Sequence, residues 1–273
     1  MKDIRLLALD LDGTLFNSEK RVPDENKAAL RAARDKGVKV VITTGRPLKA
    51  IEGLLDELDL ISDHDYVITF NGGLVQTTSG RILDKSELTR HHIAKLYKNF
   101  EPLGLPLDVL SDGTVYSVPS QGNHSLYYTA NPLLRFIEVD GVDNIPHNII
   151  YNKIVSVIDE DFLDKQIREL PIDLYDEFEI FKSRDIILEI MPKGVHKANG
   201  LNLLIGHLGL TASQVMAMGD EENDLTMLKW AGLGVAMANG ATIAKETADA
   251  VTTRTNEESG VAEAIYKYIL SED

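Results

Sequence analysis

The chain contains no cysteine among its 273 residues, and this absence removes several kinds of chemistry. Without thiols there is no disulfide, no zinc–thiolate site and no cysteine nucleophile. Long apolar runs are missing too, because no stretch approaches the roughly 20 residues that a membrane-spanning helix needs. The first residues lead directly into an expected strand and lack the organisation of a signal peptide. We therefore expect a cytoplasmic protein.

Positive charge is also scarce. The chain carries 28 lysines and arginines against 43 aspartates and glutamates, for a formal net charge of −15. Such a charge argues against nucleic acid or an anionic membrane as a partner. Composition is otherwise ordinary for a globular protein, with 44% hydrophobic residues, and the length allows one large domain or two. No feature of the sequence indicates an oligomeric state.

Strand and helix patterns alternate at both ends of the chain. Such alternation, with strands separated by helices, predicts a parallel sheet with right-handed crossovers. The expected strands lie at 4–9, 38–43, 66–70, 215–218, 234–236 and 250–252. The expected helices lie at 24–36, 48–58, 197–208, after Asp220, after a cap at Asn239, and at 261–270.

The pattern changes between about residues 81 and 193. Two apolar runs flank Ser111-Asp112-Gly113-Thr114, which indicates a hairpin. Further strands are expected at 151–158, 175–181 and 186–190, with helices at 89–100 and 161–170. This mixture predicts an α+β insert with an antiparallel sheet. We expect residues 1–82 and 194–273 to form a parallel-sheet core and residues 83–193 to form an inserted domain. An insert of this kind can close over the strand ends of a core.

The segment Asp10-Leu11-Asp12-Gly13-Thr14 directly follows the first apolar run. Two carboxylates one residue apart at a strand end repel each other unless a cation or a chemical role offsets the repulsion. Gly13 allows a sharp turn, and Thr14 can donate a local hydrogen bond. The alternative is a turn with two solvated aspartates.

Three further segments stand at strand ends or helix starts. They are Thr44-Gly45-Arg46, Lys197, and Gly219-Asp220-Glu221-Glu222-Asn223-Asp224. In a doubly wound sheet such ends converge on one edge. Four aspartates brought together there require a hard divalent cation, and oxygen ligands without thiols favour Mg²⁺.

Each of these residues also has a plainer interpretation. Thr44 could simply end a strand, and Arg46 could pack structurally or stand at the rim of a pocket. Lys197 could be an exposed lysine at a helix start, with Lys193 as a rival for its role. The acids that follow Asp220 could be ordinary residues of a helix N-terminus, favoured there by the helix dipole.

In this order, the four segments resemble motifs one to four of the haloacid dehalogenase (HAD) superfamily. The insert resembles the C2B cap of the Cof-type branch, and the whole chain is similar to the YidA-like sugar phosphatases. Matching stretches include Val41-Ile42-Thr43-Thr44-Gly45-Arg46-Pro47, Asn71-Gly72-Gly73 and Met218-Gly219-Asp220-Glu221-Glu222-Asn223-Asp224. The resemblance implies an α/β fold, a HAD-like Rossmannoid parallel-sheet core with an inserted α+β C2B cap domain.

The resemblance also implies roles for residues. Asp10 would be the nucleophile that forms an aspartyl-phosphate, and Asp12 the acid and base. Mg²⁺ would be held by Asp10, the backbone carbonyl of Asp12, and Asp220. The remaining roles concern phosphate, Lys197 and the substrate. Phosphate would be bound by Lys197, Thr44, Asn223 and the amides of Leu11 and Gly45. Asp224 would orient Lys197 or a metal-bound water. Asn71 with Gly72 would form either a simple turn or part of the substrate pocket.

These roles lead to a magnesium-dependent phosphatase of small phosphorylated metabolites, with sugar phosphates as the expected substrates. Two alternatives stay open: a phosphomutase or phosphotransferase, and a non-catalytic phosphosugar-binding protein. Dehalogenation is disfavoured because attack on a carbon–halogen bond needs no acid at Asp12. Insert residues should set specificity, with candidates in 113–122 and in 181–184, where Lys182 and Arg184 could contact an anion.

Overall fold

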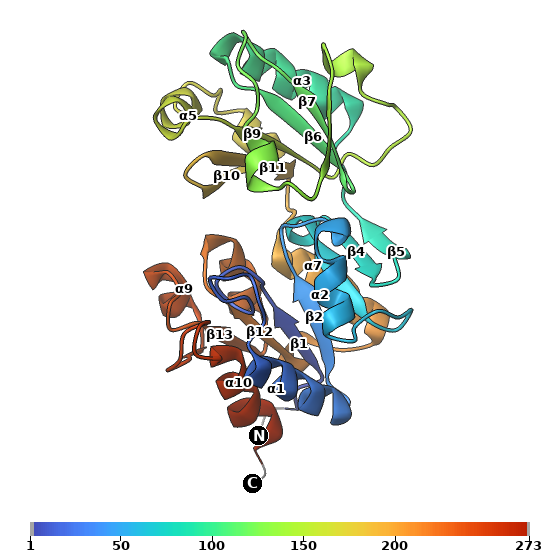
Figure 1. Cartoon of the computed structure of the whole chain (residues 1–273), viewed down its shortest axis with the longest axis vertical. Coiled ribbons are helices and arrows are strands. Elements are labelled where there is room, and N and C mark those ends of the chain that lie inside the picture. The colour runs from blue at the N-terminus through green and yellow to red at the C-terminus, as the bar shows by residue number, and fades with distance from the viewer. Residues whose placement is uncertain (1–2, 272–273) are drawn as a thin grey trace. The chain divides into compact units, whose positions relative to one another are not determined.

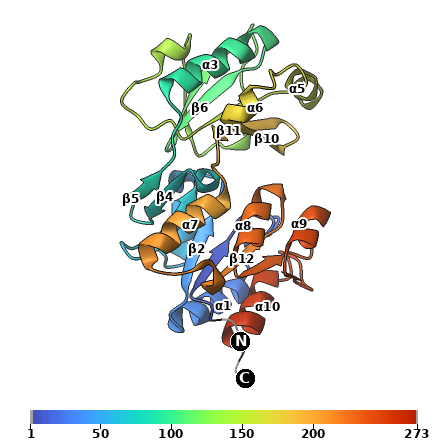
Figure 2. The ribbon, with the colours of Figure 1, turned by 180° about the vertical axis from the view of Figure 1, so that it is seen from behind.

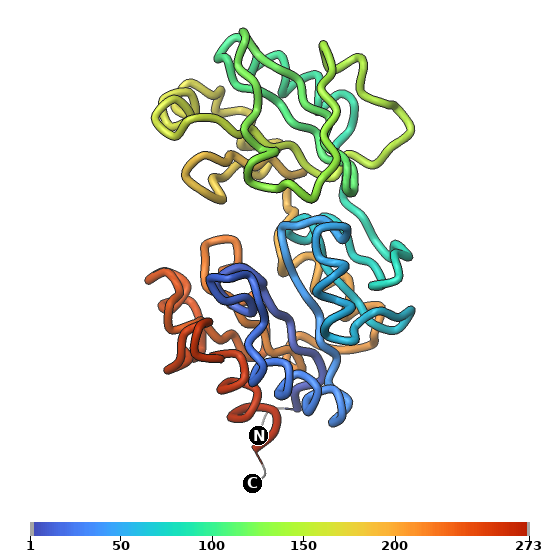
Figure 3. The backbone as a smooth tube through the Cα atoms, in the orientation of Figure 1, coloured from blue at the N-terminus to red at the C-terminus, as the bar shows by residue number. Residues whose placement is uncertain are grey.

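The computed structural model describes residues 3–271 and divides the chain into two compact units. The core unit comprises Met1–Arg46, Gly53–Asp84 and His196–Asp273, and the insert unit comprises Pro47–Glu52 and Lys85–Val195. Figure 3 follows the backbone into the long stretch of the insert, which runs from teal to gold, and back into the core. The boundaries expected at 82/83 and 193/194 stay a prediction, and the structure adds that Pro47–Glu52 groups with the insert.

The core unit is built on one eight-stranded sheet with the order β14-β13-β12-β1-β2-β3-β4-β5. The strands are β1 (Leu6–Leu9), β2 (Lys39–Thr43), β3 (Tyr66–Thr69), β4 (Leu74–Thr77), β5 (Ile82–Lys85), β12 (Val215–Gly219), β13 (Leu233–Ala236) and β14 (Ala250–Val251). Pairing is parallel from β14 to β3, which confirms the expected parallel core. The antiparallel pair β3–β4 goes beyond the expected pattern; it forms because the chain reverses directly after β3.

Helices cover both faces of this sheet, which explains why β1 is apolar along its whole length and fully buried. In Figures 1 and 2, α1 (Asp24–Asp35) and α10 (Gly260–Ile265) lie on one face, and α7 (Lys197–Leu208) and α8 (Leu225–Trp230) lie on the other. Leu201 and Leu204 of α7 pack with Leu6 of β1. After α10 the chain continues as a π-helical turn, Tyr266–Leu270.

One expected helix cap is wrong. The helix after β13 is α9 (Thr242–Thr247), and its N-cap position is held by Ala241, not by Asn239. The Asn239 side chain instead donates a hydrogen bond to the Gly13 carbonyl, with Nδ2 at 2.8 Å from the oxygen. Asn239 therefore supports the loop that follows β1.

The insert unit contains a six-stranded sheet with the order β10-β11-β9-β6-β7-β8. The strands are β6 (Leu107–Ser111), β7 (Thr114–Val118), β8 (Arg135–Glu138), β9 (Lys153–Val157), β10 (Phe178–Arg184) and β11 (Ile187–Pro192). Neighbouring strands pair antiparallel except β7 and β8, which are parallel, and β8 is absent from the expected strands. The expected β6–β7 hairpin is confirmed: Ser111 pairs with Thr114, and Asp112 adopts the left-handed conformation (φ 50°) of such turns.

Four helices accompany this sheet: α3 (Arg90–Phe100), α4 (Tyr127–Ala130), α5 (Glu160–Ile167) and α6 (Leu174–Glu177). Leu96 and Phe100 of α3 and Leu163 of α5 enter one apolar cluster with one face of the sheet. The strand expected at 175–181 is wrong at its start, because α6 extends to Glu177. The chain also holds α2 (Glu52–Glu57) and short 3₁₀ helices at Leu48–Ala50, Phe70–Gly72, Glu101–Leu103, Val142–Asn144, Ala212–Gln214 and Glu222–Asp224. Within residues 3–271, every helix is too short or too polar to span a bilayer.

Candidate active site

The loop after β1 meets the loop after β12 in the core unit. Asp10 lies directly beyond β1, and its N–H donates to the Met218 carbonyl at 3.1 Å. Gly13 has a φ of 84°, and a Cβ at this position would come within 2.1 Å of Asp220 Oδ2, so only glycine fits here. The Thr14 hydroxyl donates to Asp220 Oδ1 at 2.7 Å. Two segments 206 residues apart thus form one site.

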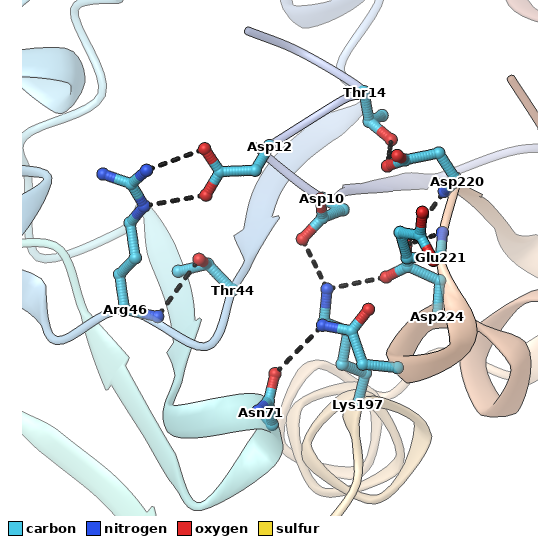
Figure 4. A network of polar contacts seen from close by, with 11 residues as sticks. Asp10, Asp12, Thr14, Thr44, Arg46, Asn71, Lys197, Asp220, Glu221 and Asp224 are labelled. Carbon is cyan, nitrogen blue, oxygen red and sulfur yellow. Dashed lines mark hydrogen bonds and ion pairs between the residues drawn. The ribbon is translucent and has the colours of Figure 1, made fainter. Parts of the chain in front are cut away.

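Three aspartates and one lysine occupy the centre of this site (Figure 4). Asp10, Asp220 and Asp224 are buried, and each offers a carboxylate oxygen that lies within 4.8 Å of the others. The Lys197 ammonium, which is fully buried, donates to Asp10 Oδ1 at 2.5 Å and to Asp224 Oδ1 at 2.6 Å. The expected convergence of these four residues is therefore present in the structure.

Asp224 also receives two backbone hydrogen bonds. Its Oδ2 accepts from the N–H of Asp220 at 2.9 Å and from the N–H of Glu221 at 3.1 Å. These bonds fix the carboxylate at the start of the segment after β12, and its other oxygen faces Lys197. Asp224 thus holds the lysine against Asp10. Glu221 and Glu222 are exposed and stand at the N-cap and first position of the 3₁₀ helix Glu222–Asp224.

Negative charge exceeds positive charge in this cluster. Burial raises the pKa of Asp10 to about 7, although Lys197 counteracts it. Burial, together with the charge of Asp10, raises the pKa of Asp220 to about 8. Burial would lower the pKa of Lys197, but Asp10 and Asp224 outweigh it and hold that pKa above its ordinary value. When all three carboxylates are ionised, one ammonium does not balance them and the site is anionic.

This donor set fits a hard divalent cation. All three groups are carboxylates, with oxygen donors only, and the chain holds no thiol that would favour a softer metal. A cation between Asp10 and Asp220 would favour the charged form of both carboxylates and so lower the pKa values that burial raises. The aspartates therefore suit Mg²⁺.

The Asp12 carboxylate points away from Asp10 and toward Arg46 (Figure 4). Arg46 donates from Nε to Oδ2 at 3.0 Å and from Nη2 to Oδ1 at 2.7 Å, and Lys20 donates to Oδ1 at 2.5 Å. Burial opposes the effect, but Arg46 and Lys20 hold the pKa of Asp12 below its usual value. The sequence indicates only a structural or rim position for Arg46 and gives no signal for Lys20, so this pairing comes from the structure alone.

Of the expected phosphate-binding residues, Thr44 and Gly45 follow β2, and Asn223 lies in the segment after β12. The Thr44 hydroxyl is buried and accepts the Arg46 N–H at 3.2 Å, which leaves its own proton to donate elsewhere. A Cβ at Gly45 would lie 3.0 Å from Asn71 Oδ1, so Gly45 packs directly on the Asn71 amide. Asn223 donates from Nδ2 to the same Oδ1 at 3.5 Å.

Two further residues with expected roles are Leu11, for phosphate binding, and Gly72, for a turn or the substrate pocket. Leu11, between the two aspartates of the first loop, is fully buried. Gly72 packs against the start of α7, because a Cβ there would lie 2.2 Å from the His196 carbonyl oxygen. Gly72 therefore lies next to the helix turn that carries Lys197.

Similarity to known proteins agrees with this geometry. A model of the haloacid dehalogenase-like hydrolases matches residues 7–265. The chain belongs to this family. It is 34% identical over 268 residues to the putative phosphatase YxeH of Bacillus subtilis (strain 168), covering 98% of this chain and 99% of YxeH. It is 35% identical over 268 residues to the 5-amino-6-(5-phospho-D-ribitylamino)uracil phosphatase YcsE of the same organism, covering 98% and 97%.

The solved structures agree as well. The HAD subclass IIB sugar phosphatase BT4131 superposes with a TM-score of 0.78 at 26% identity, covering 97% of this chain and 98% of that protein. The HAD-like fold with a parallel core is thereby confirmed, and the protein is a HAD phosphatase, a hydrolase of phosphoric monoesters. HAD hydrolases typically use Mg²⁺, and this one brings three buried aspartates together.

In this HAD phosphatase the rival lysine contacts residues of the insert unit. Lys193 belongs to the insert unit, is half exposed, and donates to the Tyr175 carbonyl at 2.7 Å. Lys182, an insert residue considered for anion binding, pairs with Asp164 at 2.5 Å beside a pocket of about 400 Å³ within the insert. Its charge is therefore already compensated.

Proposed function

We propose that this HAD phosphatase is a magnesium-dependent hydrolase of small phosphorylated metabolites, with phosphorylated sugars and polyols as its substrates, and that it acts through an aspartyl-phosphate. The observation that carries the proposal is the buried contact between Asp10 and Lys197 within the aspartate cluster. A carboxylate that is buried, desolvated and oriented by a fixed ammonium is suited to nucleophilic attack.

Asp10 would attack phosphorus in line with the leaving oxygen. Lys197 donates to Oδ1 of Asp10, so Oδ2 is the oxygen that would form the new bond to phosphorus while the bond to the leaving alkoxide breaks. Mg²⁺ held by Asp10, Asp220 and the Asp12 backbone carbonyl would supply the positive charge that a dianionic phosphoryl group needs near these carboxylates. Asp224 would keep Lys197 in place throughout.

Asp12 would act as acid and then as base. It would give a proton to the leaving alkoxide and then take one from the water that attacks the aspartyl-phosphate, so its own protonation state is restored. Its carboxylate is held by Arg46 and Lys20, so it must exchange these partners for the leaving oxygen in each cycle. The proposal therefore includes a movement of the Asp12 side chain.

The phosphoryl oxygens would be held by several neutral donors. These are the Thr44 hydroxyl, the Asn223 amide group, and the backbone N–H groups of Leu11 and Gly45. Donors fixed in a buried site need no reorganisation as charge develops in the transition state. Thr44 is suited to this task because its hydroxyl accepts from Arg46 and keeps its proton for donation.

Two relatives support the substrate class. YcsE is named for a phosphorylated ribitylamino compound, and BT4131 is named a sugar phosphatase. Both names describe a phosphate on the carbon chain of a sugar or polyol. We also propose that the insert unit is a C2B cap and that its residues select among substrates. A cytoplasmic location and the lack of a nucleic-acid or membrane partner stay predictions.

The test is phosphate release from a panel of sugar phosphates, polyol phosphates and nucleotides, with Mg²⁺ and with EDTA. We expect turnover of sugar or polyol phosphates that EDTA abolishes and that added Mg²⁺ restores. Turnover insensitive to EDTA would overturn the metal dependence, and a preference for nucleotides would overturn the substrate class. Transfer of phosphate to a second sugar, in place of release, would favour the mutase alternative.

A further inference from the structure

The turn after β3 has an unusual backbone. Phe70, Asn71 and Gly72 have φ values of 52°, 54° and 102°. A left-handed conformation is unfavourable for an L-residue because its Cβ comes too close to the following carbonyl oxygen. Among the described residues other than glycine, Phe70 and Asn71 are the only chain neighbours that both adopt it. Both are buried, and such a turn persists only where its surroundings fix it.

The backbone on one side of the turn is bonded to the segment that carries Thr44. Asn71 donates its N–H to the Thr44 carbonyl at 2.9 Å, and Phe70 donates to the Arg46 carbonyl at 3.4 Å. Thr44 in turn donates its N–H to the Ile68 carbonyl at 2.9 Å. The turn and the expected phosphate-binding loop therefore form one hydrogen-bonded unit.

The other side of the turn contacts the first turn of α7. A Cβ on Gly200 would lie 2.9 Å from the Gly72 Cα, and a Cβ on Gly72 would lie 2.2 Å from the His196 carbonyl oxygen. Lys197 stands in the same helix turn. The left-handed turn is thus wedged between the segment with Thr44 and the helix start with Lys197.

The side chain that this turn presents is the Asn71 amide, seen to the left of Lys197 in Figure 4. Its Oδ1 accepts a hydrogen bond from Asn223 Nδ2, and Gly45 lies against the same amide. One N–H of the Asn223 amide is thereby used on Asn71. The second N–H of that group is left to donate to another oxygen.

We infer that Asn71 is a positioning residue, which orients the Asn223 amide so that its second N–H meets a phosphoryl oxygen. The inference rests on the proposed function, because it takes Asn223 as a phosphate ligand. It also explains the residue type. Asparagine, aspartate and glycine tolerate the left-handed backbone best, and of these only asparagine and aspartate offer an oxygen acceptor.

The experiment is a set of double-mutant cycles on kcat/KM for the best substrate of the phosphate-release panel. Asn223→Ala is measured in the wild type, in Asn71→Gly and in Asn71→Asp. In the wild type we expect a loss of about 100-fold, as for other fixed donors to a developing oxyanion. In Asn71→Gly, which keeps the backbone but removes the acceptor, the same change should cost less than about twofold. In Asn71→Asp, which keeps the acceptor, the loss should return to that of the wild type.

Asp59→Gly is the matched control, because Asp59 shares the left-handed backbone (φ 55°) but is exposed. It should leave kcat/KM and the effect of Asn223→Ala unchanged. Melting temperatures report whether each variant folds. If Asn71→Gly does not fold, the test uses the Asn71→Asp variant. If Asn223→Ala does not lower kcat/KM in Asn71→Asp, the inference is overturned.

The experiment distinguishes a failure of the positioning role of Asn71 from a failure of Asn223 as a phosphate ligand. Equal losses from Asn223→Ala in the wild type and in Asn71→Gly would overturn the positioning role but leave Asn223 as a phosphate ligand. No loss from Asn223→Ala in the wild type would reject that ligand from the proposed function, and with it the inference.

Discussion

The Arg46 guanidinium holds both oxygens of the Asp12 carboxylate, from Nε to Oδ2 at 3.0 Å and from Nη2 to Oδ1 at 2.7 Å. Bidentate pairs of this kind fix the direction of a carboxylate as well as its charge. Arg46 is itself stacked over the Phe16 ring, with its Cζ at 5.8 Å from the ring centroid. Arg46 therefore controls where the proposed acid points before it reaches a substrate.

Replacing Arg46 by alanine should affect substrates according to their leaving group. We expect kcat/KM, which covers only the formation of the aspartyl-phosphate, to fall about tenfold or more for a sugar phosphate, because its alkoxide needs a proton from Asp12 in that step. The loss should be much smaller for p-nitrophenyl phosphate, whose leaving group needs none. Steady-state kinetics on both substrates is the measurement, and Arg46→Lys should be only partly active because lysine cannot hold two oxygens at once.

A matched control for this prediction is Arg254→Ala, which removes another arginine–carboxylate pair, with Glu25, on the exposed surface. It should leave both substrates unaffected. Equal losses on the two substrates in Arg46→Ala would contradict the orienting role of Arg46.

Replacing Lys197 by methionine should destabilise the fold strongly when metal is absent. Lys197 is fully buried and contacts two of the three carboxylates of the cluster. Removing one partner of such a buried pair costs about 3–5 kcal/mol of unfolding free energy. Urea unfolding in EDTA measures this loss. Lys229→Met on the exposed side of α8 is the control, and similar losses in both variants would contradict the prediction.

Much of the core is predictable because its strands are buried on both faces. A continuous apolar run such as β1 is recognisable from sequence alone, and the polar residues at its end must then lie on the sheet edge. The same reasoning predicts that Asp10, Thr44, Lys197 and Asp220 share one site, although they are far apart in the sequence.

The rest depends on contacts that sequence patterns do not encode. Lys20 reaches Asp12 from an exposed turn in which its own backbone is left-handed, with φ 59°, and no sequence pattern indicates this contact. The strand β8 is half-buried at most, so its apolar signal is too weak to reveal it. In residues 175–181 the apolar pattern fits a strand, but tertiary packing gives helix to Glu177. The sequence suggests Asn71 as a turn or pocket residue and gives no sign of its contact with Asn223.

Magnesium should raise the melting temperature of the wild type. The fold brings the Asp10 and Asp220 carboxylates together, so only the folded state offers this cation site, and a cation at 100 times its dissociation constant adds about 2.7 kcal/mol of stability. Thermal unfolding with Mg²⁺ and with EDTA gives the shift. Asp220→Asn should abolish it, and Glu222→Gln, an exposed acid two residues away, should not. A shift that survives in Asp220→Asn would show that the cation binds elsewhere.

The insert unit also holds a buried carboxylate that affects stability. Asp108, on β6, is fully buried, and its Oδ2 accepts from the Ser125 hydroxyl. Its Oδ1 has no hydrogen-bond partner among the described residues. Burial raises the pKa of Asp108 from 3.8 to about 6, although hydrogen bonds from Ser117 and Ser125 oppose the change.

Asp108→Asn should therefore change how stability depends on pH. Because the pKa of Asp108 is higher in the folded state, the folded protein binds more protons between about pH 4 and 6, and its unfolding free energy falls as pH rises through that window. The fall relative to Asp108→Asn should total about 3 kcal/mol and level off above the folded pKa. Urea unfolding of both proteins across this range measures the difference between their unfolding free energies. The active-site aspartates titrate in both proteins, so their contribution cancels in this difference. Asp140→Asn, at an exposed insert position, is the control, and a difference that does not vary with pH would refute the assignment.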